Sequence, residues 1–172
     1  MNEVIRNLLT RRSVRKFTDQ KITKEDLDIL LKVAIAAPSG MNKQTWQFTA
    51  VTDEEKIQKL AAAVGKALDR EKYDIYKPAA LIIPSNLRES PWGMEDNACA
   101  LENIFLAAHS LGIGSVWINQ LRHCCDEPEV RKILREWGIP DDHVIYGIAA
   151  LGYNACKDAI KVDKIGVAKI VD

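Results

Sequence analysis

The sequence predicts an α/β fold in which helices cover a central sheet, because helical and strand patterns alternate along the chain. Apolar residues recur at helical spacing in five segments: residues 3–11, 23–37, 53–69, 95–111 and 126–138. Between them lie short alternating or wholly apolar segments typical of strands: residues 46–52, 79–84, 115–118 and 144–151. No repeat and no Gly/Ser-rich linker divides the chain, so we expect a single domain over residues 1–172.

Short polar residues and glycines mark where the predicted helices begin and end. Thr23, with Asp26 three residues later, has the pattern of a capping box, and Asp53 stands at the start of the third helix. We expect Asp126 to cap the last helix, which has a proline in its first turn. Gly112 and Gly138 follow the last apolar residues of their helices and are expected to end them. Residues 162–171 are β-prone but have no obvious partner strand within the chain.

Composition excludes several classes of protein. The hydrophobic fraction is 47% and the charged fraction 28%, and 24 basic residues balance 24 acidic ones. This balance argues against binding nucleic acid by counterion release or an anionic membrane by charge. The first residues contain no secretion-signal core, and the apolar runs are too short to cross a bilayer, so we expect a cytoplasmic protein. The cysteines have neither zinc-site nor disulfide-framework spacing, which predicts reduced thiols and no metal site.

The segment RRSVRKF, residues 11–17, is the strongest candidate for binding an anion. It places three guanidinium groups and a hydroxyl within five positions at the end of a predicted helix. Arginine offers forked, charged donors and serine adds a further hydrogen bond, which together suit a phosphate. The alternative is a solvated basic turn paired with acidic neighbours. The candidate phosphate ligands are Arg11, Arg12, Ser13 and Arg15.

A second candidate segment is PSGMNKQTWQF, residues 38–48. Pro-Ser-Gly after a helix makes a turn that exposes backbone donors, and two amide side chains follow it. Such a stretch suits the edge of a flat heteroaromatic ligand, although an ordinary helix-to-strand loop is the alternative. The candidate residues are Pro38, Ser39, Gly40, Asn42 and Gln44.

No side chain stands out as a nucleophile or as a general acid or base. The Gly-x-Gly of LGIGSVWINQ, residues 111–120, precedes a strand and so has the wrong order for a dinucleotide fingerprint. Neither G-x-S-x-G nor H-E-x-x-H occurs. Cys124 and Cys125 have no base identifiable nearby. A phosphate site and a polar loop without a catalytic side chain indicate that a cofactor performs the chemistry.

Taken in order, these pieces resemble the nitroreductase family of FMN-dependent oxidoreductases over nearly the whole chain. The RRSxRxF opening is followed by APSGMNKQTWQF, in which Thr45 stands where the family commonly has proline. WGMEDNACALENIFLAAHSLGIGSVWI then matches the long central helix and the strand after it, and ALGY ends the match at residues 150–153. The resemblance implies a mixed sheet of four to five strands wrapped by helices, an α+β sandwich. It also implies an obligate homodimer in which the C-terminal strand adds to the partner's sheet.

The same resemblance assigns residues to FMN at the dimer interface. Residues 11–13 would hold the phosphate and ribityl chain together with Arg15, and the 38–44 segment would approach the flavin from the other subunit. A backbone N–H near the end of the following strand would meet the flavin N5. The family commonly offers a cation after the GY, for which Lys157, Lys161 and Lys164 are the candidates here. The strand residues at the isoalloxazine edge are Trp117, Ile118, Asn119 and Gln120.

The implied activity is ping-pong hydride transfer from NADH or NADPH, through the flavin, to an oxidised small molecule. A nitroaromatic, a quinone or an enone fits the acceptor role. Three alternatives remain: a specialised flavin enzyme on the same fold, a flavin store or sensor without turnover, and a plain phosphate-binding interaction domain. No nucleic-acid or membrane partner is expected.

Overall fold

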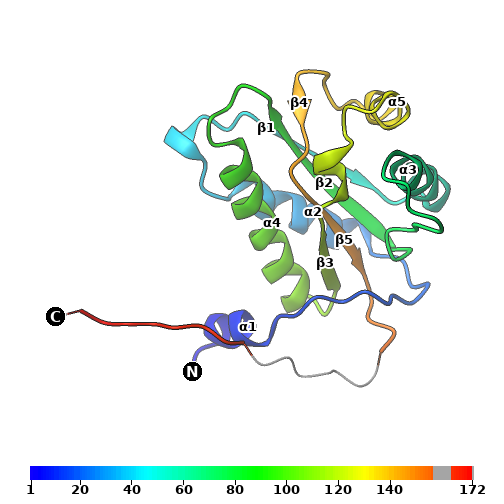
Figure 1. Ribbon diagram of the computed structural model, residues 1–172. Helices are drawn as coiled ribbons and strands as arrows, with labels where there is room; N and C mark the ends of the chain where they lie inside the picture. Colours follow the sequence, from blue (N-terminus) through cyan, green and yellow to red (C-terminus); the bar gives the residue numbers. More distant parts are fainter. Residues whose placement is uncertain (157–163, 172) are drawn as a thin grey trace.

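The computed structural model describes residues 1–156 and 164–171, which form three layers (Figure 1). A central sheet lies between one pair of helices, α2 and α4, and a second pair, α3 and α5. The helices are α1 (Glu3–Thr10), α2 (Lys24–Ile35), α3 (Glu54–Ala67), α4 (Gly93–Ser110) and α5 (Pro128–Glu136). The strands are β1 (Trp46–Val51), β2 (Ala80–Leu87), β3 (Gly114–Ile118), β4 (His143–Val144) and β5 (Ile148–Gly152). Among the described helices, none has the length and apolar character needed to span a bilayer.

The sheet has five strands in the order β1-β2-β5-β3, with the short β4 also paired to β2. All of these strand pairs are antiparallel. Within the described residues, the expected mixed character is limited to one parallel bridge, between Ser13 and Ser115. That bridge attaches the segment after α1 to the start of β3. The five strands and their helical cover agree with the predicted class.

Alternation along the strands supplies two separate cores. Leu81 and Ile83 of β2 face α3 and α5, whereas Ala80 and Ile82 face α2 and α4. The helices pack fully buried apolar residues against these strands, such as Leu60 of α3 and Leu30 of α2. Both faces of β2 are covered, which explains why residues 79–84 are uniformly apolar.

Most of the predicted helix boundaries are confirmed, and one capping residue is wrong. Thr23 and Asp53 each accept a hydrogen bond from the backbone N–H three residues later. Gly112 and Gly138 follow their helices with φ of 74° and 77°. Asp126 does not cap α5, whose N-cap is the next residue and makes no side-chain cap bond. The Asp126 carboxylate instead accepts hydrogen bonds from two guanidinium groups, those of Arg88 (2.8 Å) and Arg131 (2.6 Å).

The single strand expected over residues 144–151 is also wrong, because the chain forms β4 and β5 with a break between them. Pro84 of β2 lies opposite the break, between the residues paired with β5 and those paired with β4. Proline has no N–H to donate, so continuous pairing is not possible at this point. The Trp117 ring packs directly on Gly147, which lies inside the break, and a Cβ on Gly147 would lie 2.5 Å from ring atoms.

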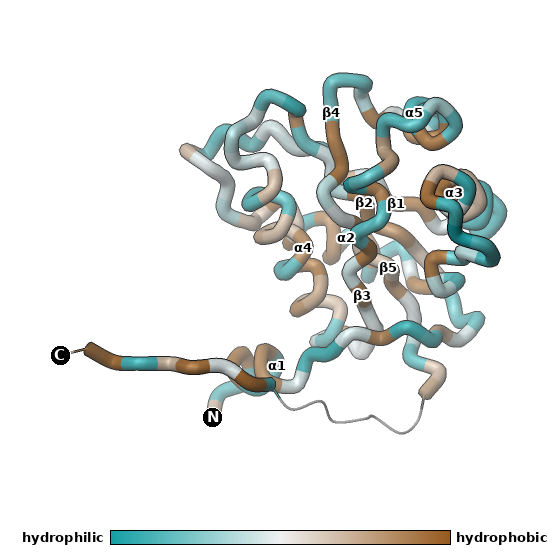
Figure 2. The backbone as a smooth tube through the Cα atoms, viewed as in Figure 1, coloured by the Kyte–Doolittle hydropathy of each residue, from teal (hydrophilic) through white to brown (hydrophobic). Residues whose placement is uncertain are grey.

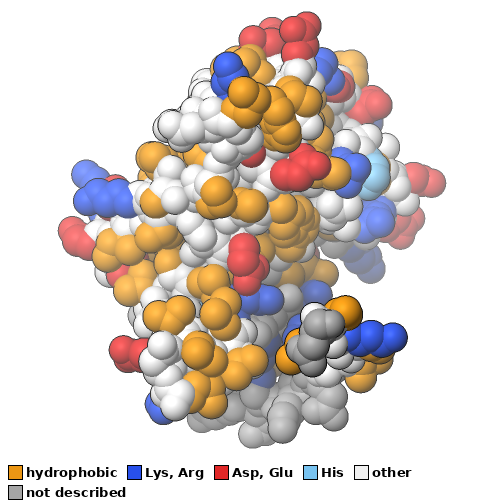
Figure 3. All heavy atoms as spheres, turned by 90° about the vertical axis from the view of Figure 1, so that its left-hand side faces the viewer, with side chains coloured by type: hydrophobic (Ala, Val, Ile, Leu, Met, Phe, Trp, Pro, Cys, Tyr) orange, Lys and Arg blue, Asp and Glu red, His pale blue; other side chains and the backbone are white. Residues whose placement is uncertain are grey.

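The two ends of the chain expose apolar residues that the core does not use. α1 is attached to α4 by its polar side, through Asn7 to the Leu106 carbonyl and Thr10 to His109. Its apolar residues point outward, and Leu9 is 71% exposed. The described end of the tail extends away from the body and is equally apolar (Figure 2), with exposures of 89–98% at Ile165, Val167, Ile170 and Val171. Figure 3 shows further hydrophobic side chains over the face that carries α4 and α1.

Candidate functional site

The residues predicted to bind a ligand lie in three separate places in one chain (Figure 1). Arg11 lies against Glu102 and Phe105 in the second half of α4. Gly40 lies against Asp96, near the opposite end of the same helix. At a rise of 1.5 Å per residue, these contacts are separated by about 9–14 Å along α4. The third group, residues 117–120, lies at the end of β3. The first and third groups share Phe105 as a neighbour, because Trp117 packs against the same ring as Arg11, whereas the 38–44 loop lies apart from them.

The segment with the three arginines follows α1 and runs along the edge of the sheet. The Val14 N–H donates to the Ser115 carbonyl (2.9 Å), and the Thr18 N–H donates to the Tyr153 carbonyl (2.8 Å). Val14 packs against Gly114, where a Cβ would lie 2.9 Å from its side chain. These contacts hold the backbone of residues 13–18 firmly against β3 and the end of β5.

The guanidinium groups of this segment have few acidic partners. Arg11 Nε lies 3.5 Å from Glu102 Oε1, and its Cζ lies 5.9 Å from the centre of the Phe105 ring. Neither Arg12 nor Arg15 forms an ion pair with another described residue. Ser13 is exposed beside them. The alternative of a basic turn paired with acidic neighbours therefore holds for Arg11 and not, among the described residues, for Arg12 or Arg15.

His109 reports the positive potential around this segment. Burial lowers the pKa of His109 below its ordinary value, and the charges of Arg11 and Arg12 lower it further. The His109 ring is hydrogen-bonded to Thr10 Oγ1 at 2.9 Å. An excess of positive charge is therefore concentrated where the sequence predicts a phosphate.

The 38–44 loop joins α2 to β1 beside the first turn of α4. Three of its non-glycine residues, Met41, Asn42 and Gln44, have positive φ of 50–55°, a conformation that costs energy. Gln44 closes the loop on itself, because its N–H donates to Ser39 Oγ (3.3 Å) and its amide to Asn42 Oδ1 (2.8 Å). The loop is ordered and polar, and it presents part of its edge to solvent, as the flat-ligand hypothesis requires.

The end of β3 carries the third group. Trp117 is 37% exposed and packs against Phe105, with ring centroids 6.3 Å apart. Ile118 is buried, whereas Asn119 is exposed and Gln120 partly so. The strand thus offers an aromatic surface followed by two amide side chains and their backbone N–H groups.

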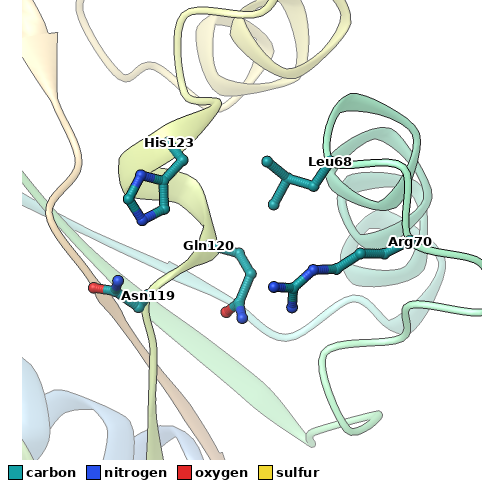
Figure 4. A pocket seen from close by; sticks show the side chains of 5 residues that line it. All are labelled: Leu68, Arg70, Asn119, Gln120 and His123. Carbon is teal, nitrogen blue, oxygen red and sulfur yellow. The ribbon is translucent and has the colours of Figure 1, made fainter.

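A pocket of about 220 Å³ opens beside Asn119 and Gln120 (Figure 4). Its other lining residues are Leu68, Arg70 and His123, and the Arg70 side chain reaches toward Gln120. A second hollow of about 420 Å³ adjoins it and is lined by residues 70–76 and Gln120. Sequence reasoning missed Arg70. In the sequence, Arg70 is only a basic residue in a polar stretch. The neighbouring residues do not indicate that this stretch folds against the end of β3.

Burial argues against the two adjacent cysteines as nucleophiles. Cys124 and Cys125 are 3% and 5% exposed, and burial raises the pKa of the Cys124 thiol to about 11. That thiol is protonated at neutral pH, which argues against a nucleophile.

Across the described residues, no group of three or more potential metal ligands comes together. Of the predicted lysines, Lys157 and Lys161 lie outside the described residues, and Lys164 is exposed.

Comparison with known proteins gives a consistent result. The model of the Nitroreductase family matches residues 8–80 and 72–153. A crystal structure of a nitroreductase with bound FMN from Bacteroides fragilis is 39% identical, with a TM-score of 0.93 and full coverage of both chains. A protein of Archaeoglobus fulgidus, provisionally named NADH dehydrogenase/NAD(P)H nitroreductase, is 38% identical over 89% of this chain and 86% of its own. The FMN reductase (NADPH) of Bacillus subtilis is 30% identical over 87% of this chain and 65% of its own.

Proposed function

The chain belongs to the nitroreductase family, and from that premise we propose an FMN-dependent NAD(P)H oxidoreductase that works as a homodimer with flavin at its interface. When bound, FMN supplies the chemistry, which is hydride transfer from NAD(P)H to an oxidised small molecule. One observation supports the homodimer proposal: the predicted flavin-binding residues of one chain form two groups at different points along α4, next to an uncovered apolar surface.

Two copies remove the apolar surface from water. The outward residues of α1 and those of the tail, which are 46–98% exposed, are the kind of patch that marks a protein interface. A second copy that covers α1 and receives the tail would bury them. The same association would bring the 38–44 loop of one subunit to residues 11–15 and 117–120 of the other. The tail then serves as an added strand, as the sequence predicts.

The residues present fit the phosphate of FMN. Arg11, Arg12 and Arg15 provide charged donors, and Ser13 provides an exposed hydroxyl. The lowered pKa of His109 is consistent with this assignment: burial is its main cause, and the charges of Arg11 and Arg12 lower it further. A phosphate dianion would neutralise that charge. Lys157, Lys161 and Lys164 remain candidates for completing the site from the tail.

The residues at the end of β3 fit the ring of FMN. Trp117 offers a partly exposed aromatic face, and the backbone N–H of Asn119 or Gln120 would serve as the donor to the ring edge. Arg70 adds a positive charge across the pocket from Gln120. A cation there would stabilise the negative charge of a reduced flavin and so raise its potential. The chain itself needs no nucleophile, in agreement with the high pKa of Cys124.

The decisive experiment is a visible absorption spectrum of the purified protein with added FMN, followed by anaerobic NADH or NADPH. We expect flavin bands that bleach with at least one of the two donors. The acceptor is then sought among nitroaromatics, quinones and enones by measuring reoxidation. Bands that persist would favour a flavin store or sensor, and no bands would contradict flavin binding altogether.

The cytoplasm is the location that this function requires, since NAD(P)H is its electron source. All four cysteines are described and are unpaired with one another, as is usual for thiols in a reducing compartment. Cell fractionation with a cytoplasmic marker enzyme tests the location.

A further inference from the structure

A buried carboxylate connects the 38–44 loop to α4. Asp96, in the first turn of α4, is only 3% exposed. Its Oδ1 accepts a hydrogen bond of 2.8 Å from the Gly40 N–H, which is 56 residues away in the chain. A bond to an ionised acceptor is stronger than one between neutral groups. The carboxylate therefore holds one particular point of the loop.

The same point is held by shape. A Cβ at Gly40 would lie 2.3–2.7 Å from atoms of the Trp92 side chain, so the loop backbone rests directly on that ring. Trp92 is the N-cap residue of α4 and makes no side-chain cap bond. Contact with the indole on one side and the carboxylate on the other leaves Gly40 little freedom to move.

The loop needs such an anchor because its own conformation is costly. The residues that follow Gly40 include three non-glycine residues at positive φ. The hydrogen bonds of side chains inside the loop, between Gln44 and residues 39 and 42, are exposed and compete with water. The contact of Gly40 with Asp96, which is part-buried, is better protected. Its loss would allow the strained residues to relax.

A gain in folding stability does not explain why the Asp96 carboxylate is buried. Asp96 Oδ2 is buried and has no hydrogen-bond partner among the described residues, which is an expensive arrangement. The favourable effect of an acidic group in the first turn is already supplied by the exposed Glu95. A buried, half-satisfied carboxylate is retained more readily where it has a task than where it only packs.

We propose that Asp96 is a positioning residue for flavin binding: its carboxylate fixes Gly40 and thereby the conformation in which Ser39, Gly40 and Asn42 approach the flavin. The inference rests on the proposed function, since it concerns the loop that would contact FMN from the neighbouring subunit. Asp96 acts through Gly40 and does not itself touch the flavin.

The test compares Asp96→Asn with Glu95→Gln in the full-length dimer. Both variants lose one negative charge from the first turn of α4, but only the first weakens the bond to Gly40. We expect the FMN dissociation constant to rise about tenfold in Asp96→Asn and to change less than twofold in Glu95→Gln. The visible circular dichroism of the bound flavin should change in the first variant alone. The urea midpoints of the two apoproteins should agree.

A second variant attacks the same contact from the loop. Gly40→Ala forces the backbone away from Trp92 and should also raise the FMN dissociation constant about tenfold. Because both substitutions weaken the same contact, the double variant should bind FMN no more than about twofold worse than either single variant. Should Asp96→Asn fail to fold, an unchanged dissociation constant in Gly40→Ala overturns the proposal.

The outcomes separate this inference from the proposed function. If Asp96→Asn binds FMN as tightly as the wild-type protein does, the positioning role is overturned and the enzyme proposal stays intact. A parallel fall in affinity and in urea midpoint for Asp96→Asn assigns the residue a structural role and also overturns the inference. Wild-type protein that binds no FMN overturns both.

Discussion

The sheet core and the two chain ends contain the same kinds of residue in opposite surroundings. Leu30 of α2 is fully buried, whereas Leu9 of α1 is 71% exposed. α2 turns its apolar stripe toward the sheet, but α1 is attached to α4 by polar side chains and turns its stripe outward. An apolar stripe that a chain does not cover itself is typical of an interface. The difference shows that the core is covered within one chain and that the apolar residues of the ends are not. It is the basis for proposing that a second copy covers them.

The largest expected effect comes from removing the tail. Deleting residues 160–172 takes away the apolar residues that the neighbouring subunit is proposed to bury. We expect the mass in light scattering to fall to that of one truncated chain, below the 19.3 kDa of a full-length chain, and bound FMN to be lost. Lys169→Ala, which keeps the apolar residues of the tail, serves as the control and should remain dimeric. A truncated protein with the mass of the full-length dimer would contradict the exchanged tail.

A matched pair of leucine substitutions sharpens the comparison. Leu30→Ala opens a cavity in the core and should lower the free energy of unfolding by about 2–5 kcal/mol. Leu9→Lys should change the folding of a single chain by no more than about 0.5 kcal/mol, as is usual on a surface, yet weaken the dimer. Urea unfolding and analytical ultracentrifugation distinguish the two effects. A Leu9→Lys dimer as tight as wild type would remove α1 from the interface.

Arg11→Ala probes the phosphate site, where a moderate effect is expected. Losing a charged hydrogen bond to phosphate costs about 1.5–3 kcal/mol, which is roughly a 10- to 100-fold rise in the FMN dissociation constant. Arg135→Ala is the matched control, since Arg135 pairs with Asp141 on the exposed side of α5 and should leave affinity unchanged. Fluorescence titration with FMN measures both. A full flavin complement in Arg11→Ala would mean that the phosphate is bound elsewhere.

The smallest expected effect is a pH dependence of core stability. Burial lowers the pKa of His143, whose Nδ1 lies 3.0 Å from Ser85 Oγ, below its ordinary 6.5; the nearby charges of Asp142 and Arg131 oppose one another. The unfolded chain therefore takes up a proton at higher pH than the folded one. Stability is full above pH 6.5 and falls as the pH drops below it, by at most about 1.4 kcal/mol per pH unit.

His143→Gln, which does not titrate, should reduce the slope of stability between pH 6.5 and 5. A residual slope of the same sign is expected from His109, whose pKa is also lowered. Urea midpoints at several pH values measure both slopes. Equal slopes in variant and wild type would show that His143 is not the group responsible.

Local patterns were sufficient for most of the helices. Thr23 and Asp53 act on backbone groups three residues away, so their role is readable from neighbouring letters. Asp126 has the same local pattern, but Arg88 and Arg131 claim its carboxylate, and Arg88 lies 38 residues away. The prediction of one strand over residues 144–151 was wrong for a similar reason, since the proline that interrupts the pairing, Pro84, belongs to β2.

The candidate site divides in the same way. The arginine segment and the 38–44 loop were found because each is a short run of residues with related chemistry. Arg70 and Asp96 were not, because Arg70 lies across a pocket from Gln120, and Asp96 lies on a helix 56 residues beyond Gly40.

The sequence by itself determined the alternation of helices and strands, their main boundaries and the family, and it supplied the candidate ligand-binding segments. These properties depend on periodicity and on contacts within a few residues. The tertiary structure alone decided that the predicted site residues lie at different points along α4 and that the apolar residues of α1 face outward. It also decided that a buried carboxylate anchors the loop, because long-range packing chooses which distant side chains share a hydrogen bond or a core.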